Sequence, residues 1–380
     1  MTEKALSPHR KRGYKLIMRR HLSFFALFAA MVFAVPAMAQ TVGISLPLSG
    51  RFEPVSARIL QGAQLALADL EQNGTPVEAL VVDDGCELKT AAEIANQFLN
   101  ADVKLVVGNL CFRLARKMAE LLNTKDGSTP TIPVIALNTR NRALAKIRDL
   151  EELPLYEIAN SSRSEARAIV DQLLPVFDGK PFAITDDGSV YGRGLADAVR
   201  LIAEQRGLRA ITNGNFRPLQ TTYLSFLRRL HKSGVEAVVI AAGAEDIATI
   251  AADIKTLEYG WQVAAGETAQ LMPFTENSGK VPAGLVMAAP KPVDAALAAD
   301  FAKRLDVPVA DIDHNFMLGY AMIEMARQIM GDGVLPTPES SYKTVVGPLT
   351  FDNEGRASPF PFTRYRWNGR EFDAQTGTGQ

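Results

Sequence analysis

The chain has 380 residues, of which 47% are hydrophobic, and its 41 Lys and Arg residues nearly balance its 42 Asp and Glu residues. This composition is typical of a globular protein of about two domains, and no basic stripe interleaved with aromatic residues indicates a nucleic-acid partner. Beyond the N-terminal leader, the sequence contains no apolar stretch that is long enough to cross a membrane.

The first 39 residues have the pattern of a secretory signal peptide. Seven basic residues accompany an apolar core at 24–35, and Ala37, Met38 and Ala39 form an A-x-A cleavage site. We therefore expect cleavage before Gln40 and export of the remaining chain, with Met18 as an alternative start. A retained membrane anchor is the other interpretation, but the apolar core is short for a membrane span.

Strands and helices alternate regularly through the first half of the exported chain. Short or alternating apolar runs indicate strands, and apolar residues at helical spacing indicate helices between them. Regular β–α alternation of this kind predicts a doubly wound sheet of parallel strands. The expected strands cover 41–46, 79–82, 103–107 and 132–136, and the expected helices cover 56–70, 90–99 and 114–122.

The same alternation begins again near Asn160, which is expected to cap a helix together with Ser161 and Ser162. Two β–α halves with a strand-rich tail predict an α/β fold of two lobes that the chain visits more than once. Strands are expected at 182–185, 210–212, 237–241, 263–265, 284–288, 344–346, 349–351 and 362–367, and helices at 163–174, 195–206, 223–230, 246–257, 295–304 and 315–330.

The two cysteines, Cys86 and Cys111, each follow one strand of a predicted parallel βαβ unit. Parallel strands end at the same sheet edge, so the two sulfur atoms can meet there, at an edge where open α/β sheets bind ligands. In an exported protein two cysteines are more often paired than free. Closing the 25-residue loop between them would stabilise the fold by about 3 kcal/mol. Two small buried thiols are the alternative interpretation.

Signatures of catalysis are scarce in this sequence. Two of the four histidines lie in the leader, and neither zinc-ligand spacing nor a phosphate-binding loop occurs. Asp83 with Asp84, and Asp186 with Asp187, could act as paired carboxylates. Each pair follows a strand, however, where acidic residues commonly lie in solvated turns. We therefore expect no enzymatic activity, no metal and no cofactor.

Residues 83–86 (DDGC) and 108–111 (GNLC) resemble the periplasmic leucine/isoleucine/valine-binding proteins of ABC transporters. The resemblance implies a type I periplasmic binding protein fold, in which two Rossmann-like lobes with parallel sheets are joined by three crossovers. It also implies a periplasmic location, a monomeric state and a membrane permease as partner. Supporting segments follow in the family's order and span nearly all of the exported chain: Ser49-Gly50 with Gly62-Ala63, residues 191–196 (YGRGLA) and residues 346–352 (VGPLTFD).

The resemblance also divides the chain into lobes. Lobe 1 is expected to comprise residues 40–159 and 289–346, and lobe 2 is expected to comprise residues 160–288 and 347–380. The three crossovers are then expected near Ala159-Asn160, Ala289-Pro290 and Val346-Gly347.

Two ligand positions of the family carry over to this sequence. Tyr191 matches an aromatic residue of the second lobe that faces the cleft, and Glu267 matches the carboxylate that receives the ligand's α-ammonium group. A carboxylate that binds a cation makes a charge-assisted hydrogen bond, which gives strong selectivity. The alternative roles are a packing tyrosine and an acidic residue at a helix N-terminus.

The side of the site that receives the ligand carboxylate departs from the family pattern. Phe112 stands where the family has a small hydroxyl residue, and Asn138, Thr139 and Arg140 stand where it has a small residue and a threonine. Phe112 either fills space meant for an aliphatic side chain or packs beneath the loop. The carboxylate would be bound by Arg140 in bidentate fashion or by backbone amides near Cys111. A surface position is the alternative for Arg140.

The sequence thus predicts the extracytoplasmic solute-binding subunit of an ABC importer. Its ligand is expected to be an amino acid or a related small molecule bearing an amine or a carboxylate, bound by hinge closure and left chemically unchanged. Leucine itself is not expected specifically, because the carboxylate side departs from the family. A sensory protein of the same fold and a periplasmic enzyme are the alternative functions.

Overall fold

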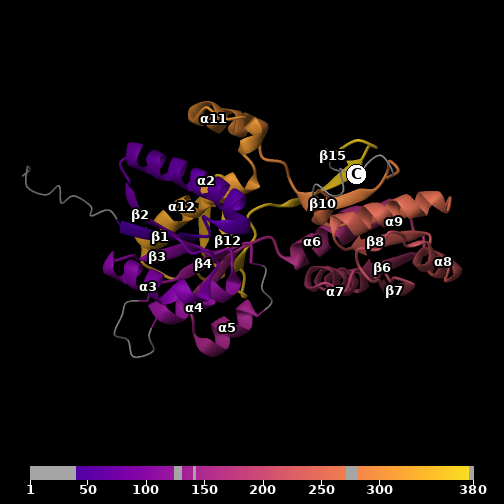
Figure 1. Cartoon of the computed structure of the whole chain (residues 1–380), viewed down its shortest axis with the longest axis horizontal. Coiled ribbons are helices and arrows are strands. Elements are labelled where there is room, and N and C mark those ends of the chain that lie inside the picture. The colour runs from indigo at the N-terminus through magenta and orange to yellow at the C-terminus, as the bar shows by residue number, and fades with distance from the viewer. Residues whose placement is uncertain (1–39, 124–130, 140–142, 271–280, 376–380) are drawn as a thin grey trace, which may run out of the picture. The chain divides into compact units, whose positions relative to one another are not determined.

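The structure is a computed structural model that describes residues 40–123, 131–139, 143–270 and 281–375 (Figure 1). The signal peptide expected for residues 1–39 lies outside these ranges. The described chain forms two large β-sheets, each with helices on both faces, and one small hairpin. The predicted α/β class with parallel sheets is therefore confirmed. No helix within the described ranges combines the length and the apolar character that a membrane span requires.

The first sheet has six strands in the order β13-β5-β4-β3-β1-β2, and all neighbours are parallel. Side chains alternate between its faces, so that Leu105 and Val107 pack with α2 and α12 while Val106 packs with α3 and α4. The bounds are β1 (Gln40–Leu46), η1 (Gly50–Phe52), α2 (Glu53–Gln72), β2 (Val77–Asp83), η2 (Leu88–Thr90), α3 (Ala91–Asn100), β3 (Leu105–Gly108), α4 (Phe112–Leu122), β4 (Val134–Leu137), α5 (Leu144–Glu151), β5 (Leu155–Ile158), α11 (Ala295–Leu305), η7 (Val309–Asp311), α12 (His314–Asp332) and β13 (Arg356–Ala357).

The second sheet has seven strands in the order β15-β14-β10-β9-β8-β6-β7 and is parallel except at β14 and β15. Val238 and Ile240 of β8 pack with α8 and α9, whereas Val239 packs with α6 and α7. The bounds are α6 (Ser162–Ala168), the π-helix η3 (Ile169–Leu173), η4 (Leu174–Phe177), β6 (Phe182–Asp186), α7 (Val190–Gln205), β7 (Thr212–Asn215), α8 (Leu224–Lys232), β8 (Ala237–Ala241), α9 (Ala244–Thr256), β9 (Gln262–Ala265), η5 (Glu267–Gln270), β10 (Val286–Pro290), β14 (Phe362–Trp367) and β15 (Phe372–Ala374).

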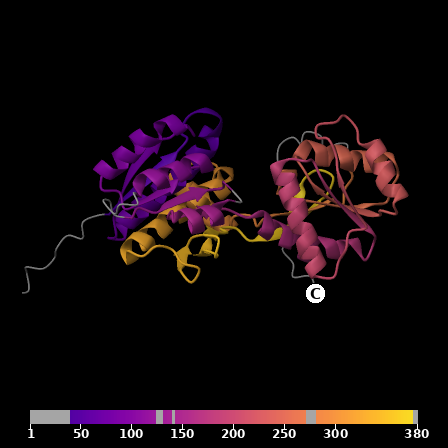
Figure 2. The same cartoon turned by 90° about the horizontal axis from the view of Figure 1, so that it is seen from below.

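The chain passes between the two sheets three times, at 159–161, 291–294 and 358–361. Figure 2 shows the orange segment that contains α12 lying among the indigo and purple elements of the first sheet, where it packs against α2. The third passage, at 358–361, lies later in the chain than the expected position near 346–347. Leu349 and Phe351 pack in the core of the first sheet, and β13 pairs with β5. The alternating pattern of this segment indicates strands, but it does not indicate which sheet they join.

A small hairpin explains why residues 347–357 stay with the first sheet. Its strands are β11 (Ser341–Thr344) and β12 (Gly347–Thr350), which pair in antiparallel fashion. Tyr342 and Leu349 are buried in the same core as α2 and α12, and the Tyr342 ring packs edge-on against Phe351 at 6.1 Å. The hairpin is therefore anchored by apolar burial before the chain returns to the second sheet.

Two glycines allow α2 and α12 to pack with their backbones in contact. A Cβ atom at Gly319 would lie 1.9 Å from the carbonyl oxygen of Ile59, and one at Gly62 would lie 2.0 Å from that of Phe316. We expect Gly319→Ala to force the helices apart and to lower the free energy of unfolding by about 1–3 kcal/mol. Urea denaturation would measure this change.

The same helix provides a matched control for this prediction. Gly331 is exposed, and a Cβ atom there would meet no other atom within 4 Å. Gly331→Ala should therefore leave the free energy of unfolding unchanged or raise it slightly, because alanine favours the helix more than glycine does. Equal effects of the two substitutions would contradict a close contact at Gly319.

Candidate functional site

Cys86 and Cys111 form a disulfide bond, as predicted, beside the carboxyl ends of β2 and β3. Their Cα atoms are 5.6 Å apart. Next to the bond, the buried Asp84 carboxylate accepts hydrogen bonds from the Cys86 N–H, the Ser45 hydroxyl and the Asn109 side-chain amide. Burial raises the pKa of Asp84 above its usual value, and these hydrogen bonds oppose that shift. The ends of β1, β2 and β3 are thus tied together at one rim.

The second cysteine also begins a helix at this rim. Cys111 is the N-cap of α4, and its carbonyl oxygen accepts hydrogen bonds from the N–H groups of Leu114 and Ala115 at 2.9 and 3.0 Å. Phe112 is the first residue of α4, is half-buried and packs against the core shared by α3 and α4. The first N–H groups of an α-helix have no acceptor within the helix and favour an anion. This rim therefore presents backbone donors suited to a carboxylate.

Asn138 and Thr139 follow β4 at the same edge of the first sheet. Asn138 is exposed, with a φ of 52° that places it in the left-handed region. The Thr139 hydroxyl donates a 2.6 Å hydrogen bond to Glu157, a fully buried carboxylate that also pairs with Arg356 at 2.8 Å. The Thr139 proton is thus used within the protein rather than offered to a ligand. Arg140 lies outside the described residues.

Glu267 opens the short helix η5 at the carboxyl end of β9, in the second sheet. Its backbone N–H donates a 2.8 Å hydrogen bond to Oε1 of Glu165. Tyr191, in the first turn of α7, donates its hydroxyl proton to the same oxygen at 2.7 Å. Burial and the neighbouring Glu165 carboxylate raise the pKa of the Tyr191 hydroxyl well above its usual value. One acceptor atom thus links the two site residues predicted for lobe 2.

A cavity of about 400 Å³ contains Glu267 in its wall together with Asn138 from the first sheet. The segments that pass between the sheets also contribute to it, through Asn160, Pro290 and Phe360. The cavity therefore lies beyond the carboxyl ends of strands from both sheets, where a ligand would touch residues of each sheet. Its remaining lining residues are Thr268, Gln270, His314 and Asn315.

Direct contacts tie the segments around this cavity to one another. The Asn160 side-chain oxygen accepts a 3.3 Å hydrogen bond from the Phe360 N–H. The His314 ring forms a hydrogen bond with the Lys291 carbonyl oxygen at 2.7 Å and packs edge-on against Phe360, with ring centroids 4.7 Å apart. Asn160 thus connects two passages of the chain, and the run 160–162 also caps the following helix, as expected. The N-cap is Ser161, in a capping box with Ser164.

The structure brings only part of the predicted site together. Asn138 and Glu267 share the cavity, and Tyr191 is joined to Glu267 through Glu165. Asn160, His314 and Phe360 were not predicted as site residues, because they are distant in sequence and meet only through the fold. For Glu165 the sequence did contain a signal. This residue precedes Ile169 by four positions and therefore lies on the apolar face of the predicted helix, which is an unusual position for a carboxylate.

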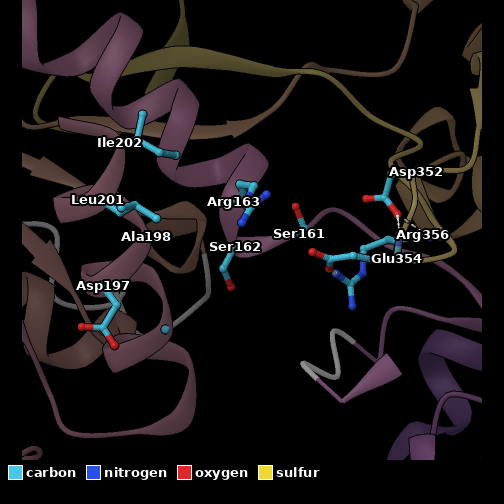
Figure 3. Close-up of a pocket in the computed structure, with 11 residues that line it drawn as sticks. Ser161, Ser162, Arg163, Asp197, Ala198, Leu201, Ile202, Asp352, Glu354 and Arg356 are labelled. Atoms are coloured by element: carbon cyan, nitrogen blue, oxygen red, sulfur yellow. Dashed lines mark hydrogen bonds and ion pairs between the residues drawn. The ribbon is translucent and has the colours of Figure 1, made fainter. Parts of the chain in front are cut away.

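A second cavity of about 350 Å³ lies at the start of α6 (Figure 3). Its wall carries Arg163 and Asp197 from the second sheet's helices, Glu354 from the turn before β13, and Arg356 from β13 of the first sheet. Arg356 pairs with Glu354 at 3.3 Å as well as with Glu157. None of the predicted site residues that the structure describes lines this cavity. The cavity around Glu267 is therefore the better candidate for the ligand site.

Comparisons with known proteins agree with this architecture. The sequence profile described as periplasmic binding protein matches residues 39–344. The Leu/Ile/Val-binding protein of Escherichia coli K12 is 22% identical over 369 residues, covering 91% of this chain and 96% of that protein.

Two solved structures share the fold. A substrate-binding protein of an ABC transporter from Desulfitobacterium hafniense, in complex with Leu, superposes with a TM-score of 0.63 at 18% identity, covering 88% of this chain and 99% of that one. The branched-chain amino acid transporter substrate binding protein LivJ from Streptococcus pneumoniae, in complex with isoleucine, superposes with a TM-score of 0.60 at 16% identity, covering 88% of this chain and 98% of that one. The type I fold of two Rossmann-like lobes is confirmed, and the profile match spans most of the sequence: the chain belongs to the periplasmic binding protein family.

Proposed function

We propose that this protein is the extracytoplasmic solute-binding subunit of an ABC importer and that its ligand is an α-amino acid or a related small amine. The observation that carries the proposal is the position of Glu267, which lines one cavity together with Asn138 of the other sheet. A ligand held there would contact both lobes, so its binding energy would favour their closure.

As a member of this family, the protein is a solute-binding protein and not an enzyme. Its function is therefore to bind and release a ligand, and the affinity depends on how well both lobes contact that ligand. The hinge consists of the three segments that join the two sheets. We propose that the outer faces of the two lobes dock on a membrane permease and that the protein acts as a monomer exported to the periplasm.

The proposed ligand contacts follow from charge and from the resemblance of these positions to the ligand positions of the family. The Glu267 carboxylate would receive the ammonium group in a charge-assisted hydrogen bond. The ligand carboxylate would be bound by backbone N–H groups at the start of α4, next to Cys111, where the helix dipole favours an anion. Arg140 remains a proposed second contact for that carboxylate. Tyr191 would cover the ligand with its ring, because its hydroxyl proton is already donated to Glu165.

The nature of the ligand side chain follows less directly from these contacts. The relatives named above bind leucine, isoleucine or valine according to their names and ligands, which supports an amino acid. In this chain, however, Phe112 packs against the core shared by α3 and α4, and the cavity is lined by Asn138, Gln270 and Asn315, which carry side-chain amides. We therefore propose an α-amino acid without restricting it to the branched aliphatic ones.

A thermal-shift screen of the protein beginning at Gln40 tests this function. The screen pairs each L-α-amino acid with the carboxylic acid that lacks its amine, such as L-leucine with 4-methylpentanoate. A ligand at one hundred times its dissociation constant stabilises the folded state by about 2.7 kcal/mol, which raises the melting temperature. We expect at least one amino acid to produce a shift that its paired acid does not. Shifts by amine-free acids alone would contradict the role of Glu267.

A further inference from the structure

Glu165 is a fully buried carboxylate on α6, with none of its surface exposed to solvent. It lies among apolar residues of the second sheet, next to Ala166 and one turn before Ile169, both of which are buried. A carboxylate is costly to bury and is retained where hydrogen-bond donors converge on it. Within the described residues, two donors on Glu165 come from the residues of lobe 2 that are proposed to contact the ligand.

These two donors use the same oxygen atom. Oε1 of Glu165 accepts the Tyr191 hydroxyl at 2.7 Å and the Glu267 backbone N–H at 2.8 Å. Tyr191 stands at the start of α7 and Glu267 at the start of η5, so the oxygen joins three separate elements. A single buried acceptor thus fixes the backbone of one proposed ligand contact and the ring of the other.

The neighbouring glycine shows how closely these groups approach. A Cβ atom at position 266 would lie 2.4 Å from Oε1 of Glu165 and 2.5 Å from the Tyr191 hydroxyl oxygen. Any side chain at Gly266 would therefore push the acceptor and its donors apart. The glycine permits close approach of the backbone, which is one of the specific uses of this residue.

We propose that Glu165 is a positioning residue, which holds Glu267 and Tyr191 in the geometry that binds the ammonium group of the ligand. This inference rests on the proposed function, because it takes Glu267 as the ammonium acceptor. Ligand contacts are most effective when their own positions are locked by a surrounding layer of hydrogen bonds. Loss of the Glu165 acceptor would free the start of η5, so that the Glu267 carboxylate no longer stands in one orientation.

Amide hydrogen exchange of the ligand-free protein tests the positioning directly. Glu165→Ala removes the acceptor, and Glu165→Gln keeps an oxygen of similar size in the same place. We expect the Glu267 amide to exchange about tenfold faster or more in the alanine variant, since it loses its hydrogen bond, and to stay protected in the glutamine variant. Glu245→Gln, an exposed position on α9, serves as the control that changes neither the acceptor nor the cavity. Unchanged exchange at Glu267 in Glu165→Ala would overturn the proposal.

A binding experiment separates positioning from a merely structural role. The probes are L-leucine with 4-methylpentanoate and L-phenylalanine with 3-phenylpropanoate, titrated by calorimetry into the wild-type protein and the Glu165 variants. Positioning predicts that Glu165→Ala weakens the binding of the amino acid more than that of its amine-free acid, so that the preference for the amine falls by about tenfold, and that Glu165→Gln restores much of the preference. A structural role alone would weaken the binding of the amino acid and of its amine-free acid equally. That result would overturn the proposal.

The two hypotheses can fail separately. If Glu267→Gln leaves the preference for the amine intact, then the proposed function of Glu267 is wrong. If Glu267→Gln removes that preference while Glu165→Ala leaves it intact, then only the positioning role of Glu165 is wrong. If none of the four probes binds to the wild-type protein, the exchange rate of the Glu267 amide still decides whether Glu165 holds η5 in place.

Discussion

Replacing Glu267 by glutamine is expected to weaken the binding of an α-amino acid by about 30-fold or more, since truncating one partner of a buried charge pair costs about 2–5 kcal/mol. The substitution keeps the size of the side chain and its position at the start of η5. It removes the negative charge that would attract the ammonium group of the ligand. It also introduces an amide N–H₂ group, a hydrogen-bond donor, which would face the N–H donors of that ammonium group. Isothermal titration calorimetry with the amino acid identified by thermal shift would measure the loss.

Two comparisons make this prediction specific. The amine-free acid paired with that amino acid should bind Glu267→Gln as well as it binds the wild-type protein, because it makes no contact with the carboxylate. Glu245→Gln makes the same chemical change at an exposed position of α9, outside the cavity, and should leave affinity unchanged. Equal weakening of both ligands by Glu267→Gln would indicate damage to the fold instead of a lost ammonium contact.

Replacing Arg356 by methionine is expected to lower the free energy of unfolding by about 3 kcal/mol, as for other buried ion pairs that lose one partner. Arg356 is 8% exposed and pairs at 2.8 Å with Glu157, which is fully buried. Methionine fills much of the same volume but cannot balance the carboxylate charge. Because Glu157 also accepts the Thr139 hydroxyl at the edge of β4, the loss would disturb this edge of the first sheet. Urea denaturation would measure it.

A double substitution tests whether the charge is responsible. Glu157→Gln combined with Arg356→Met removes both charges and keeps an acceptor for Thr139, so most of the lost stability should return. Arg163→Met provides a control at an exposed arginine of α6. A double variant as unstable as Arg356→Met alone would show that the arginine acts through packing and not through its charge.

Local patterns were sufficient to predict much of the fold. Apolar alternation in β1 and short apolar runs in β3 and β8 identified buried strands, and their regular alternation with helices predicted parallel sheets. The sheet that each late strand joins was not predictable, because that choice depends on partners far away in sequence. The segment around Leu349 reads as strand in either lobe, and its place is decided by burial against α12 and by the pairing of β13 with β5.

Less of the candidate site than of the fold could be predicted from the sequence. The disulfide was predictable because both cysteines follow parallel strands, which end at the same sheet edge, in a chain that is expected to be exported; β1 lies between these two strands in the sheet. Phe112 was left with two interpretations, since the sequence does not say whether a ring at a helix start faces solvent or core; in the structure it packs against the core. Two contacts near the cavity join residues that are distant in sequence: Asn160 with Phe360, 200 residues apart, and His314 with Lys291, 23 residues apart. Such contacts depend on the folded chain and could not be predicted from local sequence patterns.

We propose that the two lobes close around an amine-bearing ligand held by Glu267. Small-angle X-ray scattering tests it most directly, by comparing the radius of gyration of the protein alone with that at saturating concentrations of the amino acid found in the thermal-shift screen. We expect a smaller radius of gyration with the amino acid and no change with its amine-free counterpart. An unchanged radius at full saturation, established by calorimetry on the same sample, would contradict closure.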